Sequence, residues 1–123
     1  MKKVLLIPAL ISISTPASAA HWDIIVFELK SDCKIETYQE IVSDLNEWGE
    51  SYGYRTTLLK PLHHDSPNAF FRVGISDSTT NFGSAWDAWR DAQSDADSTP
   101  AKLQARFDKC STAIARRSYD AFE

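Results

Sequence analysis

The stretch YRTTLLKPLHHDSPNAFFRVGIS, Tyr54 to Ser76, holds two segments rich in β-branched and aromatic residues on either side of a polar connection. Such segments are typical of strands, and the connection HHDSPN (63–68) consists of turn-forming and polar residues, so the stretch predicts a β-hairpin. Its strands are YRTTLLKPL and AFFRVGIS. Pro61 has no backbone N–H to donate to a ladder, so we expect its strand end to lie at a sheet edge or a bulge.

A third strand and a helix precede the hairpin. The segment WDIIVFELK, Trp22 to Lys30, is continuously apolar at its centre, which is typical of a strand buried on both faces. Apolar residues at three- and four-residue spacing then predict an amphipathic helix that Gly53 ends. Two starts remain open for this helix, a capping box at Thr37-x-x-Glu40 and a start nearer Lys34. The apolar positions of the helix are Ile35, Tyr38, Ile41, Val42, Leu45, Trp48 and Tyr52.

Two helices and a short strand are predicted after the hairpin. The segment 78–81 offers caps for a helix from about Phe82 to Gln93. Thr99-Pro100 starts another helix, because proline at the first helical position loses no hydrogen bond. We expect the last strand to be short, from about Ser118 to Phe122. The buried stripe of the last helix is predicted to be Leu103, Phe107, Cys110 and Ile114.

The order of elements is strand, helix, strand, strand, helix, helix, strand, which is a βαββαβ plan with an extra C-terminal helix. We therefore predict a ferredoxin-like α+β fold, an antiparallel sheet with helices on one face. Apolar residues occupy both faces of this sheet, and the uncovered face predicts a homodimer that packs sheet against sheet. The residues concerned are Ile25, Phe27, Phe70, Phe71, Val73 and Ile75.

The N-terminus MKKVLLIPALISISTPASAA has the pattern of a secretory signal peptide, with two lysines, an apolar run and small residues at its end. The segment Ala17-Ser18-Ala19 places cleavage after Ala19, with Ala20 as the next choice. We therefore expect a signal peptide over residues 1–19 and a single α+β domain over 20–123, exported to the periplasm or secreted. The apolar run is shorter than the roughly 20 residues that span a bilayer, so no membrane attachment is expected.

The charge of the chain excludes one class of binding partner, and its two cysteines predict a disulfide. The chain carries a net charge of −4, and removal of Lys2 and Lys3 leaves 11 Lys plus Arg against 17 Asp plus Glu, or −6. Such a surface does not attract phosphate backbones, so no nucleic-acid partner is expected. Cys33 and Cys110 are most simply read as a disulfide in an exported chain. Neither lies in a C-x-x-C pair, which argues against a redox centre or a thiolate metal site.

The element order resembles that of the dimeric α+β barrel superfamily, in which two ferredoxin-like chains pack sheet to sheet. Members include antibiotic-biosynthesis-type and haem-degrading monooxygenases and NIPSNAP-like proteins. More closely, the pattern is similar to small exported bacterial proteins of unassigned function, which implies a shared fold and disulfide but no activity. The residues that carry this likeness are Cys33, Trp86-x-x-Trp89, Arg106-Phe107-x-x-Cys110 and Arg117-x-Tyr119.

The haem-degrading branch of that superfamily needs an Asn on the first strand and a haem-ligating His shortly after a Trp. Here the first strand, Trp22 to Lys30, contains no Asn, and no His follows Trp86 and Trp89. Haem degradation is therefore not carried over, and we expect no cofactor and no metal.

His63, His64 and Asp65 form the one titratable cluster with imidazoles besides His21. Adjacent side chains on a strand point to opposite faces, so the two histidines are badly placed to bind one metal. One of them beside Asp65 is a candidate general base, and a solvated turn is the alternative.

The acidic run Asp91, Asp95 and Asp97 lacks the glycine and the bidentate glutamate of a calcium loop. We therefore read it as a solvated helix exit that keeps the surface acidic.

Phe82, Trp86 and Trp89 share one helical face and are read first as core anchors. In the alternative, an indole edge lines a ligand cavity between sheet and helices, together with Tyr54, Phe70, Phe71 or His64. Arg72 is an inward charge on a buried strand and needs a partner, either Glu28 across the sheet or an acidic ligand. The candidate ligand-binding residues are thus Trp86, Trp89, Arg72 and Phe71.

Two functions follow from these residues. The leading hypothesis is an exported, disulfide-bonded α+β homodimer that acts as a binding or structural module, possible ligands being small apolar or aromatic molecules. The alternative is a cofactor-independent monooxygenase or isomerase acting on a small aromatic substrate, with His63 or His64 as base and Trp86 as a pocket wall. An enzyme of that kind needs a histidine inside the cavity.

Overall fold

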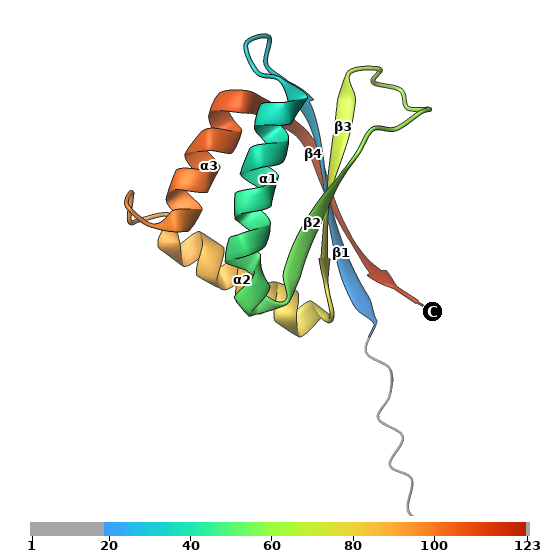
Figure 1. Ribbon diagram of the computed structural model, residues 1–123. Helices are drawn as coiled ribbons and strands as arrows, with labels where there is room; N and C mark the ends of the chain where they lie inside the picture. The colour runs from blue at the N-terminus through green and yellow to red at the C-terminus, as the bar shows by residue number, and fades with distance from the viewer. Residues whose placement is uncertain (1–18, 123) are drawn as a thin grey trace, which may run out of the picture.

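The computed structural model describes residues 19–122, and the signal peptide predicted for 1–19 lies outside this range except for Ala19. The sheet order is β2-β3-β1-β4, and every neighbouring pair is antiparallel. Figure 1 shows all three helices on one face of this sheet. The ferredoxin-like α+β prediction is therefore confirmed. The elements are β1 (Ala20–Leu29), α1 (Ile35–Gly49), the 3-10 helix η1 (Glu50–Tyr52), β2 (Tyr54–Leu59), β3 (Ala69–Ser76), α2 (Thr79–Ala92), α3 (Thr99–Cys110) and β4 (Ser111–Ala121).

Local sequence signals account for most helix ends. The Ser78 hydroxyl accepts a hydrogen bond from the Asn81 N–H at 3.1 Å and caps α2, and Ser98 does the same for α3. The N-cap of α1 is Lys34, so the start nearer Lys34 is the observed one and not the capping box at Thr37. After η1, Gly53 adopts φ 63°, a left-handed conformation that glycine enters without steric cost.

The core lies between the helices and the sheet. Phe27 of β1 stacks on Tyr38 of α1 with ring centroids 4.0 Å apart. Because strand side chains alternate between faces, Phe27 shares its face with Ile25 and Asp23. The disulfide Cys33–Cys110 is present and joins the chain before α1 to the last residue of α3. Its Cys110 is buried in the same core. The remaining buried residues of this cluster are Ile41, Val42, Leu45, Leu103 and Phe107.

The C-terminal boundary differs from the prediction. The last helix ends at Cys110 and does not reach Ile114, and the last strand runs over Ser111–Ala121 instead of only 118–122. Two observations mark the end of this helix. The backbone of Ser111 is extended, with φ −146°. The Lys30 N–H donates a hydrogen bond to the Cys110 carbonyl at 2.9 Å. β4 then pairs with β1 along its whole length, with a register shift opposite Val26 and Phe27.

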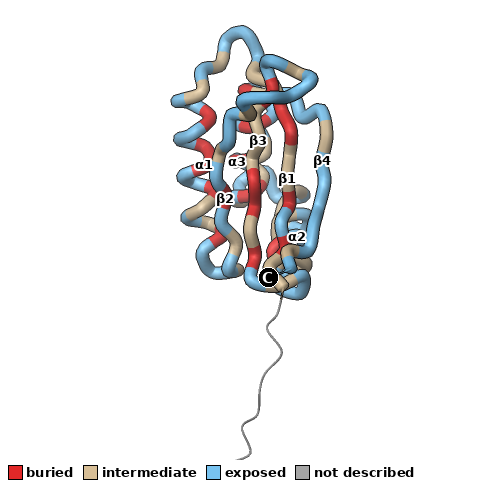
Figure 2. The backbone as a smooth tube through the Cα atoms, turned by 90° about the vertical axis from the view of Figure 1, so that its right-hand side faces the viewer, coloured by how far each residue is buried: buried red, intermediate tan, exposed pale blue. Residues whose placement is uncertain are grey.

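The other face of the sheet carries no helix among the described residues (Figure 2). Its central strands β1 and β3 are the most buried, whereas the edge strands β2 and β4 are largely exposed (Figure 2). The register places an apolar set on this face: Trp22, Ile24, Val26, Phe71, Val73 and Ile75. Within residues 19–122, no helix combines the length and apolar character needed to cross a membrane.

Candidate ligand-binding cavity

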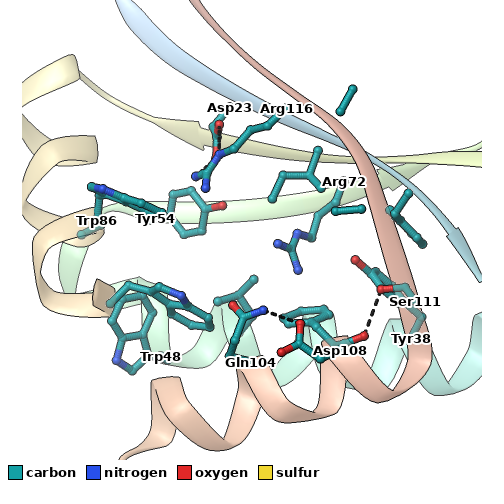
Figure 3. A pocket seen from close by; sticks show the side chains of 18 of the residues that line it. Asp23, Tyr38, Trp48, Tyr54, Arg72, Trp86, Gln104, Asp108, Ser111 and Arg116 are labelled. Atoms are coloured by element: carbon teal, nitrogen blue, oxygen red, sulfur yellow. Dashed lines mark hydrogen bonds and ion pairs between the residues drawn. The ribbon is translucent and has the colours of Figure 1, made fainter. Parts of the chain in front are cut away.

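A cavity of about 470 Å³ lies between the sheet and the helices. This volume falls in the range of roughly 300–1,000 Å³ that small-molecule sites occupy. Aromatic rings from strands β1 and β2 and from all three helices form most of its wall, and charged or polar side chains from β1, β3 and β4 reach into it (Figure 3). The aromatic residues of the wall are Phe27, Tyr38, Trp48, Tyr54, Phe82, Trp86, Trp89 and Phe107.

Helix α2 supplies the tryptophans because residues three and four apart lie on one helical face. Trp89 meets Trp48 of α1 edge to face, with ring centroids 5.3 Å apart. Trp86 is 39% exposed, and the Arg116 guanidinium lies 4.3 Å from its ring centroid. Trp86 therefore forms the outer, solvent-reaching wall, and Trp89 lies deeper between α2 and α1.

One ion pair stands on the sheet side of the cavity. The Asp23 carboxylate is 1% exposed and accepts from Nε of Arg116 at 3.0 Å and from Nη2 at 2.6 Å. The Ser118 hydroxyl adds a third hydrogen bond to the same carboxylate at 3.1 Å. Asp23 pairs with Ser118 in the ladder, and Arg116 is two residues away on the same face of β4. This carboxylate is thus fully engaged.

Arg72 projects from the middle of β3, a central strand, into the same space (Figure 3). Its guanidinium lies over the Phe107 ring, with Cζ 4.1 Å from the centroid. Its Nε and Nη1 atoms are buried, and neither has a hydrogen-bond partner within residues 19–122. The ion pairs of this described part of the chain do not include Arg72.

Tyr54 crosses the cavity from β2 and lies directly over Gly74 of β3. A Cβ at position 74 would collide with the Tyr54 hydroxyl and ring, so this close approach requires glycine. Burial raises the pKa of the Tyr54 phenol to about 12, against the opposing effect of the Arg72 charge. Burial likewise raises the pKa of Tyr38. Both phenols are therefore protonated at neutral pH and keep an O–H to donate.

The structure brings together three of the predicted site residues, since Trp86, Trp89 and Arg72 all line the cavity. Phe71 does not, because it alternates with Arg72 along β3 and faces the uncovered side of the sheet. The predicted partner Glu28 also cannot reach Arg72. It pairs with Ala69, whereas Arg72 pairs with Ile25, which puts the two side chains on opposite faces.

The hairpin histidines lie elsewhere. His63 and His64 are exposed in the connection between β2 and β3, at the end of the sheet away from α2 (Figure 1). The His64 ring packs edge to face on Phe71 at 5.2 Å, on the side of the sheet opposite the cavity. No histidine of the described chain lines the cavity.

The acidic run at the end of α2 is solvated, as read from the sequence. Asp91, Asp95 and Asp97 are exposed, and Asp95 accepts from the Asp97 N–H at 3.0 Å. Across residues 19–122, no group of three or more His, Cys, Asp or Glu side chains is arranged to hold a metal ion.

Sequence reasoning missed the Asp23–Arg116 pair and the contributions of Tyr38, Trp48 and Phe107 to the wall. One signal was available, because Asp23 is a charged residue on the same strand face as the apolar Ile25 and Phe27. Its partner was hidden, because the last strand was predicted to begin at 118, which left Arg116 outside it.

Fold and site together define a class, a ferredoxin-like α+β protein with an aromatic cavity between its sheet and its helices. Among solved structures, the chain is similar to SnoaB, a cofactor-independent oxygenase from Streptomyces nogalater. The two have a TM-score of 0.54 and 12% identity over 86% of this chain and 96% of that one. At this identity the likeness concerns the fold alone.

A second similar structure is a dimeric protein of unknown function with a ferredoxin-like fold from Bacteroides fragilis. Its TM-score is 0.46 at 10% identity, over 83% of this chain and 96% of that one. No protein-family model matches the chain, and no curated protein matches it in sequence.

Proposed function

We propose that the protein is an exported binding protein that takes a small aromatic molecule into the cavity between sheet and helices. The observation that carries this proposal is the cavity itself, about 470 Å³ in volume and walled by eight aromatic side chains. Pockets that are mostly aromatic with a few placed polar groups are the usual form of small-molecule sites. The disulfide is compatible with an oxidising compartment outside the cytoplasm.

The Trp86 wall gives the direct test. Changing Trp86 to alanine removes the outer face of the cavity, so the affinity for an aromatic probe is expected to fall at least about tenfold. The probes are 2-naphthoate and its neutral counterpart 2-naphthamide, and the measurement is isothermal titration calorimetry.

Trp22 offers a matched control for this experiment. Trp22 is 39% exposed, as Trp86 is, but its side chain lies on the opposite face of the sheet. Changing Trp22 to alanine is expected to leave both affinities unchanged. The proposal fails if the folded wild-type protein binds neither probe, or if the two variants lose affinity equally.

The uncovered sheet face supports the second part of the proposal, a homodimer. The apolar set on β1 and β3, which includes the 39%-exposed Trp22, needs a cover, and a second copy of the chain supplies one of the same shape. Sedimentation equilibrium is expected to give a dimer for the wild-type protein and a monomer for Trp22→Glu, with unchanged circular dichroism. A wild-type monomer at high concentration contradicts this part.

The alternative is a cofactor-independent oxygenase or isomerase acting on a small aromatic substrate. It is supported by the fold shared with SnoaB and by the aromatic wall. No histidine of residues 19–122 lines the cavity, so a general base would have to be another group. Of the two carboxylates that line the cavity, Asp23 and Asp108, only Asp108 takes part in no ion pair within the described chain. Oxygen uptake with a dihydroxynaphthalene that is lost in Asp108→Asn would favour this alternative. Binding without uptake or isomerisation favours the binding protein.

A further inference from the structure

We infer that the ligand of the cavity carries an anionic group such as a carboxylate, and that Arg72 binds it. This inference rests on the proposed binding function and adds the chemical class of the ligand: a small aromatic acid rather than a neutral aromatic molecule.

The first step is the burial of an unpaired charge. The Nε and Nη1 atoms of Arg72 are buried and have no hydrogen-bond partner within residues 19–122. Buried guanidinium N–H groups without partners lose their hydration and gain nothing in return, so folded chains usually pair such groups. An anionic ligand would supply the missing partner, which explains why a central strand keeps this charged residue.

The second step excludes the chain's own carboxylates. Asp23 is committed to Arg116 and Ser118 through three hydrogen bonds, and Glu28 lies on the opposite face of the sheet. Asp108 lines the cavity, but it is an exposed residue whose carboxylate accepts from Gln104 at 2.8 Å. No carboxylate of the described chain lies within ion-pair distance of Arg72.

The third step is the direction of the free donors. The Arg72 guanidinium stacks on Phe107, and the Arg72 side chain extends into the space that the cavity residues surround (Figure 3). The Tyr54 hydroxyl points into the same part of the cavity (Figure 3). It is protonated at neutral pH and can donate to an oxygen of the same anion. The aromatic body of the ligand then lies against the tryptophans of α2.

The test compares matched acids and amides: benzoate with benzamide, and 2-naphthoate with 2-naphthamide. Calorimetry on the wild-type protein is expected to give affinities for the acids at least about tenfold above those for the amides. Arg72→Gln is expected to lower the affinities for the acids much more than those for the amides, and so to abolish this preference. Arg72→Lys, which keeps the charge but not the planar guanidinium, is expected to retain part of it.

Arg106→Gln is the matched control, because it makes the same change at an exposed arginine of α3 outside the cavity. It is expected to keep the full preference for the acids. Arg72→Gln removes a buried unpaired charge and is expected to melt at or above the wild-type temperature, so its folding does not obscure the result.

The failures are distinguishable. Equal affinities for acid and amide, unchanged in Arg72→Gln, overturn the inference and leave the binding function in place. A preference for the acids that persists in Arg72→Gln also overturns it, because the anion then binds elsewhere. Failure of the folded protein to bind all four probes overturns the proposed function, and this inference with it.

Discussion

The double variant Cys33→Ala, Cys110→Ala is expected to lose about 4 kcal/mol of unfolding free energy, the largest effect we predict for any change in this chain. The disulfide joins residues 77 apart in sequence. Without it, the unfolded chain regains the loop-closure entropy that the bond removes. In the folded state, the bond ties the entry of α1 to the junction of α3 and β4.

Urea unfolding followed by circular dichroism measures this loss, and the melting temperature is expected to fall by more than about 15 °C. Wild-type protein held in reducing agent is the control, because it lacks the bond but keeps both side chains, and it should match the double variant. A variant as stable as the oxidised wild type would show that the bond does not constrain the unfolded chain.

Arg116→Gln is expected to cost about 3 kcal/mol, the second largest effect. The Asp23 side chain is 1% exposed, and two of its three hydrogen bonds come from Arg116. Removing the guanidinium leaves a buried carboxylate with only the Ser118 hydroxyl. The cost lies at the low end for buried pairs because the Arg116 side chain is itself 41% exposed.

The reciprocal change provides the control. Asp23→Asn leaves Arg116 without its anion, but a guanidinium that already reaches solvent is hydrated, so the loss is expected to be clearly smaller. The double variant Asp23→Asn, Arg116→Gln should recover part of the cost of Arg116→Gln. Equal losses in the two single variants, measured by urea unfolding, would contradict the burial argument.

Much of the fold is predictable because it rests on local signals. The β3 segment AFFRVGIS ends where its apolar pattern ends, and Ser78 and Ser98 cap helices that begin one residue later. The β4 segment carries no such signal. It is an exposed edge strand, and its cavity-side positions Arg116, Ser118 and Asp120 are polar because they pair with His21 and Asp23. Pairing with β1, not local pattern, determines this strand.

The part of the site that rests on local sequence patterns was also predictable. Helical spacing places Trp86 and Trp89 on one face, and the isolated charge of Arg72 marks an inward position, but strand alternation separates Phe71 from them. The Asp23–Arg116 contact joins residues 93 apart and depends on the register of β4 against β1, which no local pattern specifies. Two aromatic contacts likewise depend on helix packing: Tyr38 of α1 meets Phe107 of α3, and Trp48 of α1 meets Trp89 of α2.

The central claim, that the cavity binds small aromatic molecules, is tested most directly by nuclear magnetic resonance of the four tryptophan indole N–H groups. Three of these residues, Trp48, Trp86 and Trp89, line the cavity, and Trp22 lies on the far face of the sheet. Titration with 2-naphthoate is expected to shift the three cavity signals, with a common dissociation constant, and to leave the Trp22 signal in place. Movement of the Trp22 signal alone, or of none of the four, would contradict the account.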